Sequence, residues 1–203
     1  CVNLLQRYKR SAQYWEAKLT EEAASSEGAG ETIFDHLVPG RTCGDCVECC
    51  RILEIRDENL AKPAGQLCGH NNGKGCGIYA ERPGVCRTWY CLWRRIPSMP
   101  DETRPDRARV VASIDSFDPP RTPFEKLYVV CRAIDSPADL QTTVGRNIIE
   151  MFKDAGQMPV FGSFGGQKWI VYPSQRMAVI VDRPWMARES EIDELNRWRE
   201  ILG

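Results

Sequence analysis

The chain has 203 residues, of which 42% are hydrophobic and 27% charged, a composition that excludes a disordered or fibrous protein. No apolar run approaches the roughly 20 residues that a membrane-spanning helix needs, so we expect no membrane association and a cytoplasmic protein. The 27 Lys and Arg residues nearly balance the 28 Asp and Glu residues, so no overall basic field favours nucleic acid as a partner. Local pairs such as Arg94-Arg95 are interpreted as solvated surface. Because the chain begins at Cys1 rather than at Met, we expect a fragment or a renumbered chain, with any targeting peptide upstream.

An amphipathic helix is predicted near the start of the chain. Apolar residues recur at helical spacing from Leu4 to Leu19, and residues 23–30 are small residues that end the helix. Residues 1–40 are therefore interpreted as an N-terminal helix and linker.

Cysteine is the most unusual part of the composition. Eight of the ten cysteines lie within 49 residues, whereas Cys1 and Cys131 stand apart. The eight are Cys43, Cys46, Cys49, Cys50, Cys68, Cys76, Cys86 and Cys91. A disulfide scaffold is normally shorter and spreads its bridges over the whole fold, so the tight spacing favours metal over disulfides. Residues 41–96 are also rich in Gly and Pro, and we expect an irregular region that is ordered by metal.

Residues 97–203 are predicted to form a small unit of sheet and helices. In chain order, the predicted elements are strands at 109–114 and 126–131, a helix at 136–156, strands at 168–172 and 177–181, and a terminal helix from 190 onward. In the terminal helix, the residues expected to face inward are Ile192, Leu195, Trp198 and Ile201. The glycine-rich residues 162–166 are interpreted as a hairpin connection. This order of elements predicts an α+β fold.

Three side chains of the predicted strands are interpreted without a role in metal binding. Strand alternation places Cys131 beside Val129 on one face, where an unpaired thiol is expected to pack as a small buried hydrophobe rather than to bind metal. Asp115 and Asp118 lie near strand ends and are interpreted as surface charges.

The strongest motif is Cys43-Gly44-Asp45-Cys46-Val47-Glu48-Cys49-Cys50. Two intervening residues let a turn bring both thiolates of a pair to one ion, and three cysteines at successive three-residue steps are typical of ferredoxin-type ligation. Adjacent side chains point about 100° apart on a helix, so Cys49 and Cys50 are not expected to chelate one ion as a pair. The doublet indicates either two neighbouring sites or one ligand beside a spectator thiol.

Further downstream, the chain carries Cys68, then Cys76-Gly77-Ile78-Tyr79, Arg82-Pro83, Cys86-Arg87 and Cys91. With the octet, this order resembles the bacterial CxxCxxCC cysteine-cluster family, described as a zinc- or iron-chelating domain and related to the cysteine-cluster part of flagellin lysine N-methylases. The resemblance covers about 50 residues and implies metal binding by the eight cysteines. It implies no methylase activity, since nothing else in the chain resembles a methyl-donor site.

Neighbours of the cysteines have expected supporting roles. Arg82 and Arg87 are predicted to bind the cofactor by donating to cluster sulfurs, while Tyr79 and Trp89 are expected to shield the site from water. His70 stays open as an alternative ligand, because histidine is a common zinc ligand.

Spacing does not identify the metal, because four thiolates leave a net charge of −2 around Zn²⁺ and around an oxidised cubane cluster alike. Eight cysteines also divide into two sets of four in 35 ways. The three-step cysteine run and the family favour an iron–sulfur cluster of the 4Fe-4S type, with zinc as the alternative.

Three functions follow from these alternatives. The first is an iron–sulfur protein in a redox, sensing or metal-handling role. The second is a structural zinc module with two four-cysteine sites that supports a partner-binding α+β domain. The third is an enzyme with the cluster at its active site. The partner would be an unidentified protein or small molecule.

Overall fold

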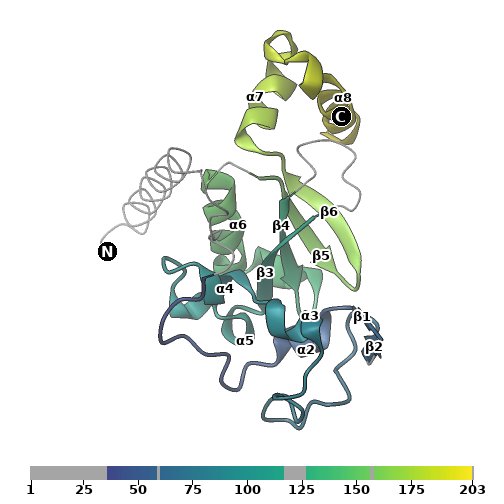
Figure 1. Cartoon of the computed structure of the whole chain (residues 1–203). Coiled ribbons are helices and arrows are strands. Elements are labelled where there is room, and N and C mark those ends of the chain that lie inside the picture. Colours follow the sequence, from purple (N-terminus) through teal and green to yellow (C-terminus); the bar gives the residue numbers. More distant parts are fainter. Residues whose placement is uncertain (1–35, 59, 117–126, 156–157, 203) are drawn as a thin grey trace, which may run out of the picture.

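The computed structural model describes residues 36–58, 60–116, 127–155 and 158–202 (Figure 1). Most of the predicted N-terminal helix and linker, together with Asp118 and Gly156, lies outside the described residues. The fold is α+β, as predicted, with helices around one four-stranded and one two-stranded sheet. Among the described residues, no helix is long and apolar enough to span a bilayer.

The larger sheet has the strand order β3-β4-β5-β6. Strand β3 (Val110–Asp115) pairs antiparallel with β4 (Tyr128–Ala133), β4 pairs parallel with β5 (Val160–Phe164), and β5 pairs antiparallel with β6 (Gln167–Tyr172). The sequence predicts β3, β4 and β6 to within about two residues. The strand β5 was not predicted, because its Gly162 and Ser163 read as part of a hairpin. Only Gly165 and Gly166, both at positive φ, make the turn.

The predicted helix from Ser136 is present but is divided in two. Pro137–Gln141 forms a 3₁₀ helix, η3, and the α-helix α6 covers Thr143–Ala155. At the start of η3, the carboxylate of Asp139 accepts a hydrogen bond from the backbone N–H of Ser136 at 3.1 Å. Helix α6 begins so close to η3 that a Cβ on Gly145 would lie 2.2 Å from the Asp139 carbonyl oxygen, so only glycine fits there.

The prediction of a strand at 177–181 is wrong, because Gln175–Asp182 forms the helix α7. Its first turn is capped by Ser174, whose hydroxyl accepts a hydrogen bond from the backbone N–H of Met177 at 3.2 Å. The β-branched residues suggested a strand, but Met177 and Ile180 are three positions apart and share one helical face.

That face packs against the predicted terminal helix, α8 (Ile192–Leu202), which follows the 3₁₀ turns η4 (Pro184–Met186) and η5 (Glu189–Glu191). In α8, Leu195 and Trp198 are buried as predicted. Ile192 is 44% exposed, so its predicted inward position is wrong. It is the first residue of α8, where the chain has only just left η5. The side chain of Ile201 lies outside the described residues.

The cysteine region lies at the opposite end of the sheet from α7 and α8 (Figure 1). It contains short elements joined by loops: α2 (Glu48–Ile52), the hairpin of β1 (Ile55–Asp57) and β2 (Leu60–Lys62), α3 (Gly84–Thr88) and α4 (Leu92–Arg95). The 3₁₀ helix η1 (Asp101–Thr103) and α5 (Pro105–Ala108) then lead into β3.

Both faces of the sheet are covered. One face packs against α6 in a core that includes the fully buried Cys131 beside Val129, as the strand alternation predicts. Leu92 and Trp93 of α4 belong to this same core. On the opposite face, Val111 and Ile134 pack with Ile52 and, less fully buried, Trp89 of the cysteine region. The regions predicted at 41–96 and 97–203 therefore share apolar cores.

Candidate metal centre

The octet folds as a turn followed by a short helix. The backbone N–H of Cys46 donates to the carbonyl of Cys43 at 2.9 Å, and Gly44 supplies the positive φ of the turn. Helix α2 then carries Cys49 and Cys50 at successive positions, so their side chains leave the helix about 100° apart.

Cys91 lies close to the start of the octet because the side chain of Arg41 joins the two segments. The Arg41 guanidinium donates to the carbonyl oxygens of Trp93, Ile96, Pro97 and Met99. A backbone hydrogen bond of 2.8 Å from Val38 to the Arg94 carbonyl continues this contact. Sequence reasoning did not anticipate Arg41, since an arginine that binds carbonyls 52 to 58 residues away leaves no local pattern.

Backbone pairing brings Cys68 beside α2 and turns the chain back at Cys76. The N–H of Cys68 donates to the carbonyl of Cys50 at 3.0 Å. From there, a tight loop returns the chain through the bridge between Asn71 and Cys76. Cys86 lies in α3.

Electrostatic interactions group Cys43, Cys46, Cys49 and Cys91, which we call the first quartet. A hydrogen bond with Cys50 and burial raise the pKa of Cys49, and the charges of Cys43 and Cys46 raise it further. Burial raises the pKa of Cys91 to about 11, and the charges of the same two cysteines contribute. Cys49 and Cys91 are therefore both within electrostatic reach of the first cysteine pair.

The remaining cysteines, Cys50, Cys68, Cys76 and Cys86, form a second quartet in the same sense. Burial raises the pKa of Cys86, and the charges of the other three add to the shift. The hydrogen bond from Cys49 lowers the pKa of Cys50 to about 7, with help from the nearby positive charges of Lys62 and Arg82.

A buried cation accompanies each quartet. Lys62 is only 5% exposed, and its ammonium donates to the carbonyls of Arg51, Pro63 and Gln66 near the second quartet. Arg94 lies beside Cys91 of the first quartet, and its Nε and Nη1 are buried and make no hydrogen bond among the described residues. Arg94 is therefore not solvated surface, as its sequence suggested. Neither cation was predicted as part of the site.

The predicted supporting residues differ in their placement. Arg82 lies 4.0 Å above the ring of Tyr79, and its charge acts on Cys50 and Cys86. Arg87 is exposed and donates from Nε to the Arg82 carbonyl at 2.7 Å. Tyr79 lines the cavity but is 58% exposed, so its shielding role stays a prediction, whereas Trp89 also packs against the sheet core.

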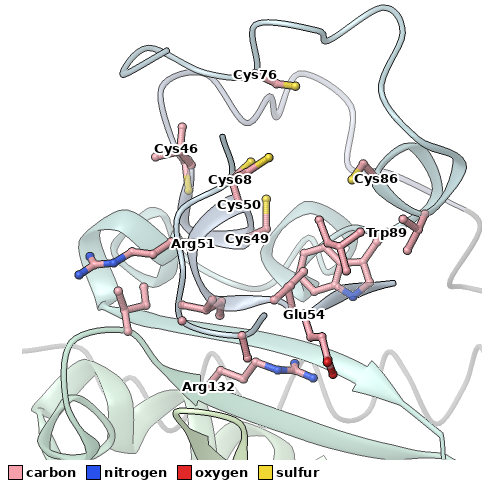
Figure 2. Close-up of a pocket in the computed structure, with 18 of the residues that line it drawn as sticks. Cys46, Cys49, Cys50, Arg51, Glu54, Cys68, Cys76, Cys86, Trp89 and Arg132 are labelled. Atoms are coloured by element: carbon pink, nitrogen blue, oxygen red, sulfur yellow. The ribbon is translucent and has the colours of Figure 1, made fainter. Parts of the chain in front are cut away.

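Seven of the eight cysteines line one cavity of about 840 Å³; Cys91 is the exception. Figure 2 shows Cys49, Cys50 and Cys68 near its centre, Cys76 across the opening and Cys86 beside α3. The exposed His70 also lines it.

The sheet forms the opposite wall through Asp115, Arg132, Ser163 and Lys168. Burial opposes the charge of Asp115, but Arg132 and Lys168 outweigh burial and lower its pKa. The interpretation of Asp115 as a surface charge is wrong, because its side chain is 21% exposed and paired with both cations.

All nine cysteines among the described residues are free thiols. In that same part of the chain, no three Cys, His, Asp or Glu side chains converge closely enough to hold a metal ion as they stand. The chemistry of the donors nevertheless fits a thiolate-bound metal, since thiolates are soft ligands and buried cations offset their charge. Comparisons with protein-family models, curated proteins and solved structures found no match. The resemblance to the CxxCxxCC family therefore stays a prediction from the motif.

Proposed function

We propose that this chain is a metal-cluster protein that binds iron–sulfur through the cysteines from Cys43 to Cys91, in a redox, sensing or metal-handling role. The observation that carries the proposal is the gathering of seven free thiols around one cavity, with the buried ammonium group of Lys62 within electrostatic reach of four of them. A buried lysine is stable where negative charge surrounds it, and thiolates bound to a metal supply that charge.

Iron–sulfur is favoured over zinc by the ligand run. Cys43, Cys46 and Cys49 follow one another at three-residue steps, the spacing that ferredoxins use. When bound, the cluster would supply one-electron transfer, while the protein supplies the thiol ligands and the surrounding charge. Lys62, Arg82 and Arg94 would offset the net negative charge of the thiolate cluster, which favours its reduced form.

A structural zinc module remains the second candidate. It is favoured by the electrostatic interactions that link Cys49 and Cys91 to the first cysteine pair and Cys86 to Cys50, Cys68 and Cys76, beside short elements that pack on the sheet. Zinc bound by four thiolates contributes folding free energy directly and has no redox chemistry.

Spectroscopy of anaerobically purified protein separates the two candidates. The iron–sulfur proposal expects a brown protein with absorption near ~400 nm, iron and acid-labile sulfide in equal amounts, and an electron paramagnetic resonance signal on reduction or oxidation. Colourless protein that retains zinc after anaerobic reconstitution with iron and sulfide would overturn it. A Cys131→Ala variant is the matched control, because it removes a thiol from the sheet core and none from the cavity.

A further inference from the structure

We infer that the eight cysteines form two separate four-cysteine metal sites, the first held by Cys43, Cys46, Cys49 and Cys91 and the second by Cys50, Cys68, Cys76 and Cys86. The inference rests on the proposed function, in that these thiols bind metal. It adds the number of sites and one specific division of the ligands out of the 35 possible ones.

The cysteine doublet is where the two sites divide. Cys49 and Cys50 occupy successive positions of α2, and side chains about 100° apart on a helix serve different neighbours. Cys49 and Cys50 interact with each other through a hydrogen bond, but the charges of Cys43 and Cys46 act on Cys49, and those of Cys50, Cys68 and Cys76 act on Cys86. Helix α2 therefore supplies one ligand to each of two adjacent sites, whose thiols at Cys49 and Cys50 are in contact.

The first site is completed by Cys91 through tertiary contacts. The hydrogen bonds of Arg41 fasten the segment before Cys43 to the segment that follows Cys91. Arg94 is beside Cys91 and has two buried nitrogens without a hydrogen bond among the described residues. Buried guanidinium nitrogens without hydrogen bonds are stabilised by a nearby negative charge. A metal site with four thiolate ligands would carry such a charge.

The second site is assembled by the loop from residue 68 to residue 77 and by α3. Cys68 is anchored by its backbone hydrogen bond to Cys50, and the bridge of Asn71 with Cys76 turns the chain back. The buried Lys62 lies within electrostatic reach of Cys50, Cys68 and Cys86, and also of Cys49 in the first quartet. Three of its four cysteine neighbours therefore belong to the second quartet, whereas the partly buried Arg94 lies beside the first.

The two sites differ in access. All four cysteines of the second quartet line the cavity, opposite the polar sheet wall that includes Arg132 and Lys168. Cys91 of the first quartet does not line it and packs against the apolar cores on both sides of the sheet. Cys43, Cys46 and Cys49 also line the cavity, so the difference in access comes from Cys91 alone. The first site is therefore the less accessible of the two, and it braces the region against the sheet.

The division of ligands is tested by paired Cys→Ser variants of the anaerobically reconstituted protein. Cys91→Ser and Cys86→Ser alone are each expected to lower the metal content per protein to about half. The within-quartet pair Cys43→Ser/Cys91→Ser is expected to lose no more than Cys91→Ser alone. The cross-quartet pair Cys86→Ser/Cys91→Ser is expected to lose nearly all metal, and Cys131→Ser none.

A second measurement uses the unaltered protein, so it does not depend on whether the variants fold. Metal is removed stepwise with a chelator, freed thiols are alkylated, and the labelled positions are mapped by mass spectrometry. We expect metal loss in two phases of similar size, with labelling of Cys50, Cys68, Cys76 and Cys86 in the first phase. Labelling of the first quartet is expected in the second phase.

The outcomes separate this inference from the proposed function. Zinc in two sites with the same division of ligands supports the inference and overturns iron–sulfur. One cluster released in a single phase, or a first phase that labels cysteines of both quartets, supports metal binding and overturns the two sites. Protein that binds no metal after reconstitution overturns both.

Discussion

The cysteine region and the sheet are held together by different means. In the sheet, strands of five or six residues bury side chains such as Val111, Val130 and Cys131 completely. Between residues 41 and 96 no element exceeds five residues, and the buried apolar residues are few and mostly face the sheet. Burial can therefore stabilise the sheet, whereas the loops from 66 to 86 have little apolar surface to bury. The proposed thiol-bound metal would therefore stabilise the part of the chain where burial contributes least.

The two regions are joined by ion pairs as well as by their shared apolar cores. The guanidinium of Arg109, at the start of β3, contacts the buried Glu48 of α2 at 2.7 Å and Asp135 at 2.6 Å. Asp135 also pairs with Arg51 of α2 at 3.1 Å. Helix α2, which carries the cysteine doublet, therefore contacts the sheet side through ion pairs as well as through apolar packing.

Metal removal is expected to produce the largest difference between the regions. Chelation should unfold residues 43–91 while β3–β6 and α6 persist, because burial maintains only the second group. Hydrogen exchange followed by mass spectrometry should show protection in peptides from 60–88 falling by more than about 100-fold, the change that ~3 kcal/mol of lost local stability produces. Equal protection with and without metal would contradict the idea that metal holds this region.

Gly145→Ala should show the reverse pattern. The new Cβ would lie 2.2 Å from the Asp139 carbonyl oxygen, so η3 and α6 must separate. We expect a loss of about 3 kcal/mol in the free energy of unfolding, measured by urea denaturation, with metal per folded protein unchanged. Gly69→Ala is the matched control, since nothing lies within 4 Å of its Cβ. A small cost for Gly145→Ala would show that the packing of α6 on η3 is not rigid.

Arg41→Ala tests the connection between the regions. It removes hydrogen bonds to four carbonyls that follow Cys91, and we expect a loss of about 2 kcal/mol. Arg41→Lys should restore little of the lost stability. The planar guanidinium donates in several directions to the four carbonyl oxygens, whereas a compact ammonium group cannot reach all of them. Chelator release of metal from Cys91 should accelerate in Arg41→Ala. The exposed Arg56→Ala, in the hairpin of β1 and β2, is the control.

Glu191→Gln concerns the α7–α8 end of the molecule, far from the cysteines in Figure 1. Hydrogen bonds from Arg176 lower the pKa of Glu191 to about 2, against a burial that works in the opposite direction. Because the folded-state pKa lies below the unfolded one, this stabilisation is present above about pH 4.5 and is lost as the pH falls toward 2.

We expect Glu191→Gln to cost about 1.5 kcal/mol at pH 7, a value reduced for the solvent around Arg176, and almost nothing near pH 2. Thermal unfolding followed at both pH values measures the difference. A cost that does not change with pH would mean that packing rather than charge matters at Glu191. Metal content should be that of the unaltered protein.

Cys131→Ala should have the smallest effect. The residue is fully buried between strands and α6, so loss of its sulfur should cost about 1 kcal/mol. Metal content should not change, because Cys131 packs in the core on the α6 face of the sheet. A folded variant that lost a full equivalent of metal would show that the two regions share a site.

Much of the sheet and the candidate ligands could be predicted from local pattern. Runs of β-branched residues at 109–114 and 126–131 indicated the strands that form at Val110–Asp115 and Tyr128–Ala133, and the octet indicated thiol ligands. Both signals depend on residues close in sequence. Only the tertiary structure decided that Gln175–Asp182 is a helix. Its apolar residues fit both strand and helix spacing, and packing against α8 selects the helical face. The tertiary structure also decided the burial of Lys62 and Arg94 and the placing of Cys91 beside Cys43. These depend on contacts between segments up to 58 residues apart, which one-dimensional spacing does not encode.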